Sequence, residues 1–217
     1  MSIADNLKIV TENIKEAAVK AGGKPEEIKL CAVTKTASVQ EIIEAIEAGV
    51  KCIGESRVHL AQDKFQNLPP VEKHMIGHLQ TNKVKRAVEI FDCIQSVDSL
   101  RLAKEINKRA MDFGKVMQIM VQINVSGEDQ KFGISPEEVG RFYNEILKLT
   151  NLKVKGVMTI APFIEDEDTR YIFRKTKAIA DELNLKEISM GMTNDYKIAI
   201  EEGSTMVRVG RAIFKKE

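Results

Sequence analysis

Short apolar runs and longer amphipathic stretches alternate along the whole chain. The apolar runs are rich in valine, isoleucine and methionine, as is typical of strands that are buried on both faces of a sheet. They lie at 29–34, 50–54, 73–77, 92–97, 116–125, 154–160, 187–192 and 206–209. Between them, apolar residues recur at three- and four-residue spacings, which predict helices with one buried face.

Capping and stop signals define the helices further. Ser38 and Glu41 have the S-x-x-E spacing of a capping box, and 135–138 repeats it with proline at the first helical position. Asp98 is a further N-cap candidate, and glycines such as Gly49 end helices. These signals predict helices at 2–22, 38–48, 55–65, 81–90, 98–114, 135–149, 166–184 and 194–202.

Strict alternation of strand and helix predicts an α/β fold with a parallel sheet. Eight such units within 217 residues, without a composition break or a sequence repeat, favour one (β/α)8 TIM barrel over an open doubly wound sheet. We expect residues 1–217 to form this single domain. Because the chain ends soon after the last strand, we expect the extra N-terminal helix, 2–22, to cover the gap left by a missing eighth outer helix.

Composition narrows the class of protein. The 33 basic and 32 acidic residues are interspersed and give a net charge of +1, which argues against nucleic acid or an anionic membrane as the partner. No apolar run is long enough for a membrane span, and the N-terminus lacks a signal-peptide profile, so we expect a cytoplasmic protein. Cys31, Cys52 and Cys93 lie in strand-like runs without C-x-x-C spacing, and we expect reduced, buried thiols.

The first candidate for chemistry is a lysine that directly follows the first apolar run. Lys35 lies at the carboxyl end of that predicted strand, where α/β folds bind their ligands. Its amine can form a Schiff base with an aldehyde, and desolvation favours the reactive neutral form. By position alone a solvated loop lysine is the commoner case. The other strand ends therefore have to decide between the two interpretations.

The last two strand ends indicate a phosphate site. Met192, Thr193 and Asn194 lead into a short helix whose free amides and dipole favour an anion. Gly210 permits a close backbone approach after the last strand, and the loops after strands seven and eight are the usual phosphate site of such barrels. Arg208 lies within the last apolar run and needs a partner, because a buried, unpaired guanidinium is costly. A ligand role is favoured for it.

The histidines do not indicate a metal site. No two of them have the spacing of metal ligands together with a carboxylate. His59 is expected on a helix surface and His74 within a strand. His78, which follows the third strand, is open to either a structural or a ligand-binding interpretation.

Several motifs, taken together, resemble a known family. They are AVTKT (32–36), IGES (53–56), HMIGHLQTNK (74–83), SVDS (96–99), VQINVSGEDQKFG (121–133), VKGVMTI (154–160) and ISMGMTNDYKIAIEEGSTMVRVGRAIF (188–214). In this order and spacing the chain resembles the pyridoxal phosphate homeostasis proteins, a single-domain barrel family similar to the N-terminal domain of alanine racemase. The motifs span nearly the whole chain.

The resemblance implies a cofactor and its ligands. Lys35 would carry pyridoxal 5′-phosphate (PLP) as a Schiff base. The other cofactor-binding residues that it implies are Ser56, His78, Asn124, Met158, Ser189, Gly191, Met192, Thr193, Arg208 and Gly210. This chain departs from the family at Ser56, commonly asparagine, at His59-Leu60, commonly a glutamine-glutamate pair, and at Thr193, which replaces a serine.

The resemblance also implies how the cofactor would be used. It places Arg208 beside the pyridine nitrogen, where a cation weakens the ring as an electron sink. Alanine racemase further needs a tyrosine base from a C-terminal domain that this chain does not contain. We therefore expect a monomeric protein that carries and buffers PLP in PLP homeostasis, has apo-PLP enzymes as possible partners, and has no efficient catalytic activity.

Two alternatives stay open at this point. The first is a weak PLP-dependent amino-acid racemase, which would need a base opposite Lys35. Tyr143, Tyr171 and Tyr196 all fall on predicted helices rather than at strand ends. The second is a barrel that binds a phosphosugar or nucleotide non-covalently, in which Lys35 would be only an electrostatic contact.

Overall fold

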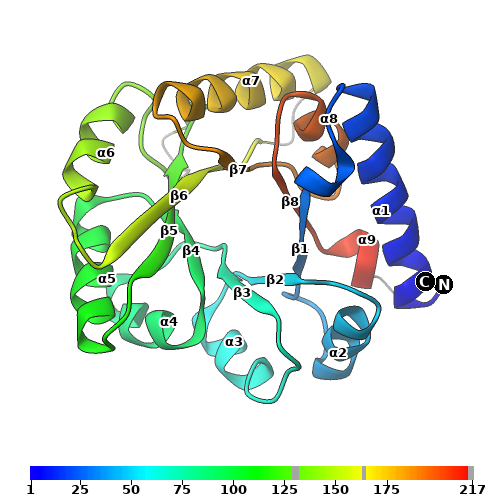
Figure 1. The fold of residues 1–217 in the computed structure, drawn as a ribbon, viewed down its shortest axis with the longest axis horizontal. Helices are drawn as coiled ribbons and strands as arrows, with labels where there is room; N and C mark the ends of the chain where they lie inside the picture. Colours follow the sequence, from blue (N-terminus) through cyan, green and yellow to red (C-terminus); the bar gives the residue numbers. More distant parts are fainter. Residues whose placement is uncertain (129–131, 163–164, 215–217) are drawn as a thin grey trace.

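A closed barrel of parallel strands forms the centre of the computed structural model, which describes residues 1–128, 132–162 and 165–214. The strands pair in chain order, and β1 pairs with β8 to close the ring (Figure 1). In the described part they are β1 (Lys29–Val33), β2 (Cys52–Glu55), β3 (Glu72–Met75), β4 (Cys93–Val97), β5 (Met117–Ile123), β6 (Leu152–Thr159), β7 (Glu187–Ser189) and β8 (Met206–Val209).

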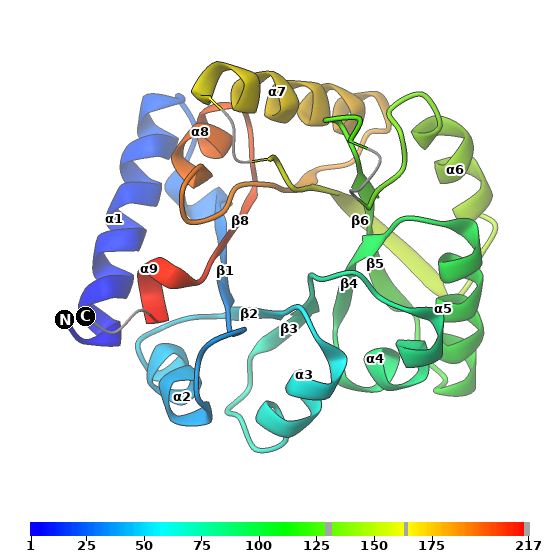
Figure 2. The ribbon, with the colours of Figure 1, turned by 180° about the vertical axis from the view of Figure 1, so that it is seen from behind.

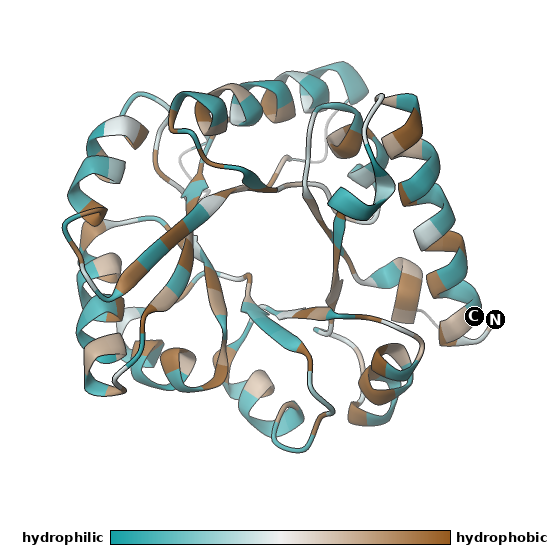
Figure 3. Cartoon of the chain, in the orientation of Figure 1, coloured by the Kyte–Doolittle hydropathy of each residue, from teal (hydrophilic) through white to brown (hydrophobic). Residues whose placement is uncertain are grey.

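Helices form an outer ring around these strands (Figure 1). They are α1 (Ile3–Lys20), α2 (Val39–Glu47), α3 (Val58–Lys64), α4 (Val84–Ile90), α5 (Leu100–Asp112), α6 (Val139–Ile146), α7 (Asp166–Glu182), α8 (Tyr196–Glu201) and α9 (Arg211–Phe214), with short 3-10 turns η1 (Pro25–Glu27) and η2 (Thr81–Lys83). Apolar and polar residues alternate along the helices (Figure 3), and most of the apolar ones are buried. The predicted TIM barrel is confirmed. No helix of the described part is long and apolar enough to cross a membrane.

The N-terminal helix covers the barrel as predicted. In Figures 1 and 2, α1 lies in the outer ring between α2 and α8, and α9 packs on its inner side. Leu7, Val10 and Ile14 form its buried face, and the Asn6 side chain donates a hydrogen bond of 3.0 Å to the carbonyl of Ile213 in α9. The short helix α9 follows β8 and was not predicted.

The start of α5 differs from the prediction. Ser99, rather than Asp98, is its N-cap, because the Ser99 hydroxyl accepts a hydrogen bond from the backbone amide of Leu102. Asp98 instead lies 3.4 Å from Nδ1 of His78.

The predicted second capping box is wrong. The side chains of Ser135 and Glu138 do form a hydrogen bond of 3.1 Å, but Glu138 is itself the N-cap of α6 and makes no side-chain capping bond. The turn at 135–138 leads directly into α6, which begins at Val139. The capping box of Ser38 and Glu41 is complete, because each side chain accepts a hydrogen bond from the backbone amide of the other residue. It begins α2 as predicted.

The seventh strand is shorter than predicted. It ends at Ser189, because Gly191 has φ +92° and turns the chain away from the sheet. A Cβ atom at this glycine would lie 2.5 Å from Cβ of Ala199, so its absence lets the loop pack directly on α8. This turn places Met192 to Asp195 at the barrel mouth.

Cysteine and methionine side chains form a separate buried cluster in the barrel. Cys31, Cys52 and Cys93 are free and buried, as predicted. They pack together with Ile76, Met120, Met158 and Met206. Side chains along a strand alternate between its two faces. A residue two positions from one of these cysteines on the same strand therefore faces the same side as that cysteine.

The packing of α1 gives a testable prediction for stability. Leu7 is 6% exposed, whereas Ile9 on the same helix is 48% exposed. We expect Leu7→Ala to lower the free energy of unfolding by about 2–5 kcal/mol, because it leaves a cavity under α1. Ile9→Ala should change it by no more than about 0.5 kcal/mol. If urea unfolding showed the same loss of stability for Leu7→Ala and Ile9→Ala, α1 would not pack on the barrel through the face that contains Leu7.

Candidate functional site

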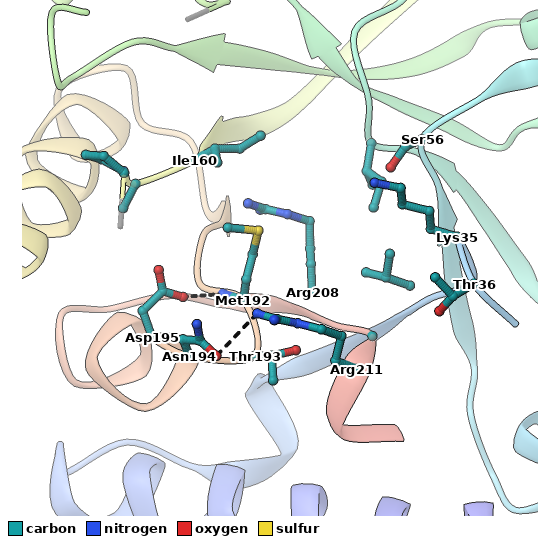
Figure 4. Close-up of a pocket in the computed structure, with 15 residues that line it drawn as sticks. Lys35, Thr36, Ser56, Ile160, Met192, Thr193, Asn194, Asp195, Arg208 and Arg211 are labelled. Atoms are coloured by element: carbon teal, nitrogen blue, oxygen red, sulfur yellow. Dashed lines mark hydrogen bonds between the residues drawn. The ribbon is translucent and has the colours of Figure 1, made fainter. Parts of the chain in front are cut away.

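The carboxyl ends of the strands surround a cavity of about 410 Å³ (Figure 4). This volume lies within the range of small-molecule sites, about 300–1,000 Å³. The predicted site residues that line it are Lys35, Ser56, Met192, Thr193, Arg208 and Gly210. The other lining residues are Val33, Thr36, Ile76, Ile160, Ala161, Pro162, Asn194, Asp195 and Arg211.

Lys35 is held by its backbone rather than by its side chain. Nζ of Lys64 on α3 donates hydrogen bonds to the carbonyl oxygens of Thr34, at 2.8 Å, and of Lys35, at 3.3 Å. The Lys35 residue is exposed, and its side chain extends to the cavity (Figure 4). A fixed backbone with a free amine suits a group that must reach a ligand.

A buried carboxylate orders the wall next to Lys35. Glu55 is fully buried at the end of β2, and its Oε1 accepts a hydrogen bond of 2.7 Å from the backbone amide of Ser56. Its other oxygen accepts from the hydroxyl of Thr34, at 3.2 Å, and lies 3.5 Å from Nζ of Lys64. The ends of β1 and β2 are therefore tied together by one ion pair and its hydrogen bonds.

The opposite wall carries Arg211 and the start of a helix, together with the carboxylate of Asp195. The loop 192–195 leads into α8, and the backbone amide of Met192 donates to the side chain of Asp195. Burial raises the pKa of Asp195. Arg211 at the start of α9 donates a hydrogen bond of 3.4 Å to the Asn194 side chain (Figure 4). A cation and a helix start thus lie at the position where the sequence predicts a phosphate.

Arg208 connects the cavity to the barrel interior. It is 3% exposed, and its guanidinium donates to the hydroxyl of Ser189, at 2.7 Å, and to the carbonyl of Thr159, at 2.8 Å. These are the partners that the sequence required. Burial lowers the pKa of Arg208 to about 10, so the side chain stays cationic at neutral pH.

Three other predicted site residues do not line this cavity. Ser189 and Met158 are fully buried beneath it, the first as the partner of Arg208 and the second in the sulfur-rich cluster. Gly191 shapes the loop, and its carbonyl accepts a hydrogen bond of 2.9 Å from the backbone amide of Arg208. These three residues thus support the site from below and do not line the cavity.

His78 and Asn124 lie further away. The His78 ring stacks on Phe132 with a centroid distance of 3.6 Å, next to a second cavity that shares Lys35 and Ser56 with the first. The Asn124 side chain donates a hydrogen bond of 3.0 Å to the carbonyl of Glu128 and accepts one from Ser126.

Sequence reasoning missed part of the lining. Ile160, Ala161 and Pro162 form a wall after β6, and no motif distinguishes such a wall from ordinary core residues. Arg211 was recognisable, because it directly follows Gly210 in the predicted phosphate loop.

One group of potential metal ligands occurs among the described residues, outside this cavity. Atoms of Cys52, Glu72 and His74 lie within 4.8 Å of one another. However, Nε2 of His74 lies 2.8 Å from one Glu72 oxygen, and Nζ of Lys29 lies 2.9 Å from the other. The carboxylate therefore already has an ammonium partner, which opposes a divalent cation at the same place.

No tyrosine lines the cavity in the part of the chain that the structure describes. Tyr143 lies on α6, and Tyr171 is 59% exposed on α7. Tyr196 is buried in α8, and burial raises its pKa. A tyrosine base opposite Lys35 is not found.

Comparisons with known proteins find relatives that match nearly the whole chain. The family model of the N-terminal domain of alanine racemase matches residues 6–217. The pyridoxal phosphate homeostasis protein of Aquifex aeolicus (strain VF5) is 40% identical over 223 residues, which cover 99% of this chain and 98% of that protein. PipY of Synechococcus elongatus PCC7942, solved with PLP bound, has a TM-score of 0.86 and 31% identity and covers 98% of this chain and 100% of its own.

An alanine racemase of Clostridium difficile 630 shares the fold. Its TM-score is 0.78 at 21% identity, and the match covers 98% of this chain but 57% of the racemase chain. The chain belongs to the family of the alanine racemase N-terminal domain and, within that family, to the pyridoxal phosphate homeostasis proteins.

The loop at Gly191 gives a prediction with an internal control. Gly191→Ala should lower the free energy of unfolding by about 1–3 kcal/mol, because the new methyl group meets Ala199 and Tyr196 at a positive φ. Gly140 lies in α6 with open space around it, so Gly140→Ala should be neutral or stabilising by up to about 1 kcal/mol. A chemical denaturation series checks both, and a neutral Gly191→Ala would contradict the tight packing.

The Glu72 carboxylate gives a pH-dependent prediction. Its hydrogen bond with His74, against the cost of burial and with help from Lys29, lowers its pKa to about 2. A lowered pKa stabilises the fold above the unfolded value of 4.5, and this stability is lost as the pH falls towards 2. We expect Glu72→Gln to cost about 2 kcal/mol at neutral pH and progressively less between pH 5 and 2.

The matched control for Glu72 is a surface glutamate. Glu12 is 60% exposed and pairs with Lys15 at 3.4 Å, so Glu12→Gln should change stability by less than about 1 kcal/mol. Urea unfolding across this pH range checks both variants. A pH-independent loss in Glu72→Gln would contradict the assigned ion pair.

Proposed function

We propose that this chain, with residues 1–217 as one barrel domain, binds PLP through a reversible Schiff base on Lys35 and carries and buffers it in PLP homeostasis. One observation carries the proposal. The Lys35 amine, the loop 192–195 and Arg211 all line the same cavity. An aldehyde and a phosphate on one small molecule match these two features.

The residues present fit this cofactor. Lys35 would hold its aldehyde carbon, while Thr193, Gly210 and Arg211 would hold its phosphate. Ile160 and Ala161 supply an apolar surface for an aromatic ring. The cavity of about 410 Å³ is also open to solvent, as exchange of a carried cofactor requires.

The remaining predicted ligands keep a role in the proposal. Ser56 lines the cavity beside Lys35, and Met192 lines it from the loop 192–195. Ser189, Gly191 and Met158 would act from beneath, by fixing Arg208 and the loop. His78 and Asn124 would contact the cofactor only if it extended beyond this cavity.

Limited catalysis is part of the proposal. Bound PLP supplies an aldehyde for amine exchange and a ring that can act as an electron sink. Arg208 is a buried cation, and a cation near the pyridine nitrogen disfavours protonation of that nitrogen. The absence of tyrosine from the described cavity lining removes the second base that a racemase uses. Both features oppose efficient turnover.

The relatives support the cofactor and the biological role. The curated relatives are named pyridoxal phosphate homeostasis proteins, and the PipY structure contains PLP. We propose apo-PLP enzymes as recipients, a monomer as the working form and the cytoplasm as the compartment. Three free, buried cysteines accord with a reducing environment.

The test of the covalent site compares two substitutions of one lysine. Lys35→Ala and Lys35→Arg should both lose the absorbance band that PLP gives on forming a Schiff base in the wild type. The arginine variant keeps the charge, so it separates covalent from electrostatic binding. If Lys35→Arg binds PLP as tightly as the wild type does, Lys35 is only an electrostatic contact, and the non-covalent barrel is the correct alternative.

The same protein also tests the racemase alternative. With PLP bound, we expect amino-acid racemisation far below ordinary enzyme turnover, about 1–1,000 per second. Circular dichroism of single amino-acid enantiomers measures it. Turnover within that range would make the chain an enzyme and overturn the carrier assignment.

A further inference from the structure

A continuous series of side-chain contacts runs from the cavity into the barrel. Arg208 donates to the hydroxyl of Ser189 at 2.7 Å, and this hydroxyl lies 2.6 Å from Oε1 of Gln95. The amide nitrogen of Gln95 lies 2.6 Å from Nδ1 of His74, and Nε2 of His74 lies 2.8 Å from Glu72. Glu72 in turn accepts from Lys29 at 2.9 Å.

This path is built from separate strands and shielded from water. Arg208 comes from β8, Ser189 from β7, Gln95 from β4 and His74 from β3. Gln95 and Ser189 are fully buried, and His74 is 1% exposed. At the far end, Glu72 and Lys29 are partly exposed, with side-chain exposures of 32% and 41%. Buried polar side chains in such a series are costly unless each is satisfied.

The Gln95 amide suits this position because it has one donor and one acceptor end. When Nδ1 of His74 carries no proton, the Gln95 oxygen accepts from Ser189 and its nitrogen donates to Nδ1. If His74 carries a second proton, rotation of the amide by half a turn exchanges the two ends and keeps both contacts. In each case the Ser189 oxygen still accepts from Arg208.

The path does not serve as a proton wire. A guanidinium keeps its protons, so Arg208 cannot pass one on to the cavity. What the path does supply is orientation. It sets the position of the Ser189 oxygen, which with the Thr159 carbonyl fixes two of the guanidinium nitrogens. It also ends on Glu72, a carboxylate that is paired with Lys29.

We propose that Gln95 and His74 are positioning residues of the cofactor site, which hold Ser189 and thereby fix the direction in which Arg208 faces PLP. The inference rests on the proposed function, since it names how that site is oriented. Neither residue lines the cavity, and neither belongs to the predicted set of ligands. Their effect on a bound cofactor would be exerted through Arg208.

The test removes the amide while keeping the size of the side chain. Gln95→Met deletes both polar ends, and Gln95→Glu keeps an acceptor for Ser189 and can pair with a protonated His74. The control is Ser96→Ala on the same strand, because the Ser96 hydroxyl is buried and has no hydrogen-bond partner within the described residues. His74→Phe tests the same path from its other side if Gln95→Met fails to fold.

Two measurements are made on each variant. The first is the dissociation constant and absorbance band of PLP as a function of pH. The second is the side-chain 15N–1H signal of Arg208 in the PLP-free protein, which reports its hydrogen bonding directly. We expect Gln95→Met and His74→Phe to raise the dissociation constant about five- to tenfold and to shift the band and the Arg208 signal. Gln95→Glu should have an affinity, an absorbance band and an Arg208 signal close to those of the wild type, and Ser96→Ala should match the wild type in all three.

The outcomes separate this inference from the proposed function. If folded Gln95→Met keeps the wild-type affinity, band and Arg208 signal, Gln95 does not position Arg208, and the inference is wrong. If the wild type takes up no PLP on Lys35, the proposed function fails. The Arg208 signal of the PLP-free protein then still shows whether the path holds the guanidinium.

Discussion

The burial of one guanidinium is the constraint on which the site depends. Arg208 lies inside a closed barrel at 3% exposure, where an unpaired charge would cost several kcal/mol. The hydroxyl of Ser189 and the carbonyl of Thr159 satisfy it from two neighbouring strands. A cation in this position can face a ligand at the barrel mouth only while those strands keep their register, so fold and site are specified together.

The two sides of the cavity are built by different means. On one side, the buried Glu55 ties the ends of β1 and β2 and leaves the Lys35 amine free. On the other side, the turn at Gly191 packs the loop 192–195 on α8, and we propose this loop as the phosphate site. A lysine amine and an arginine that line one cavity would suit the proposed aldehyde phosphate, and the curated relatives carry a name that matches this chemistry.

Much of this was predictable from the sequence, for physical reasons that differ between residues. Lys35 directly follows an apolar run, so the local pattern alone predicts that it lies at a strand end. Arg208 lies within an apolar run, so its burial, and with it the need for hydrogen-bond partners, was also predictable. The link from Ser189 to Gln95 and His74 was not predictable. It depends on the register between distant strands, for example His74 opposite Cys93, which no local pattern encodes. The turn at 135–138 shows the converse, since a local capping pattern is present there but the helix begins after it, at Val139, without a side-chain cap.

The most direct test of the central claim is to locate the bond itself. After incubation with one equivalent of PLP and reduction with borohydride, the protein is digested and every labelled peptide is identified by mass spectrometry. The account predicts that the pyridoxyl group is found on Lys35. A label spread over surface lysines, with Lys35 unmodified, would contradict it.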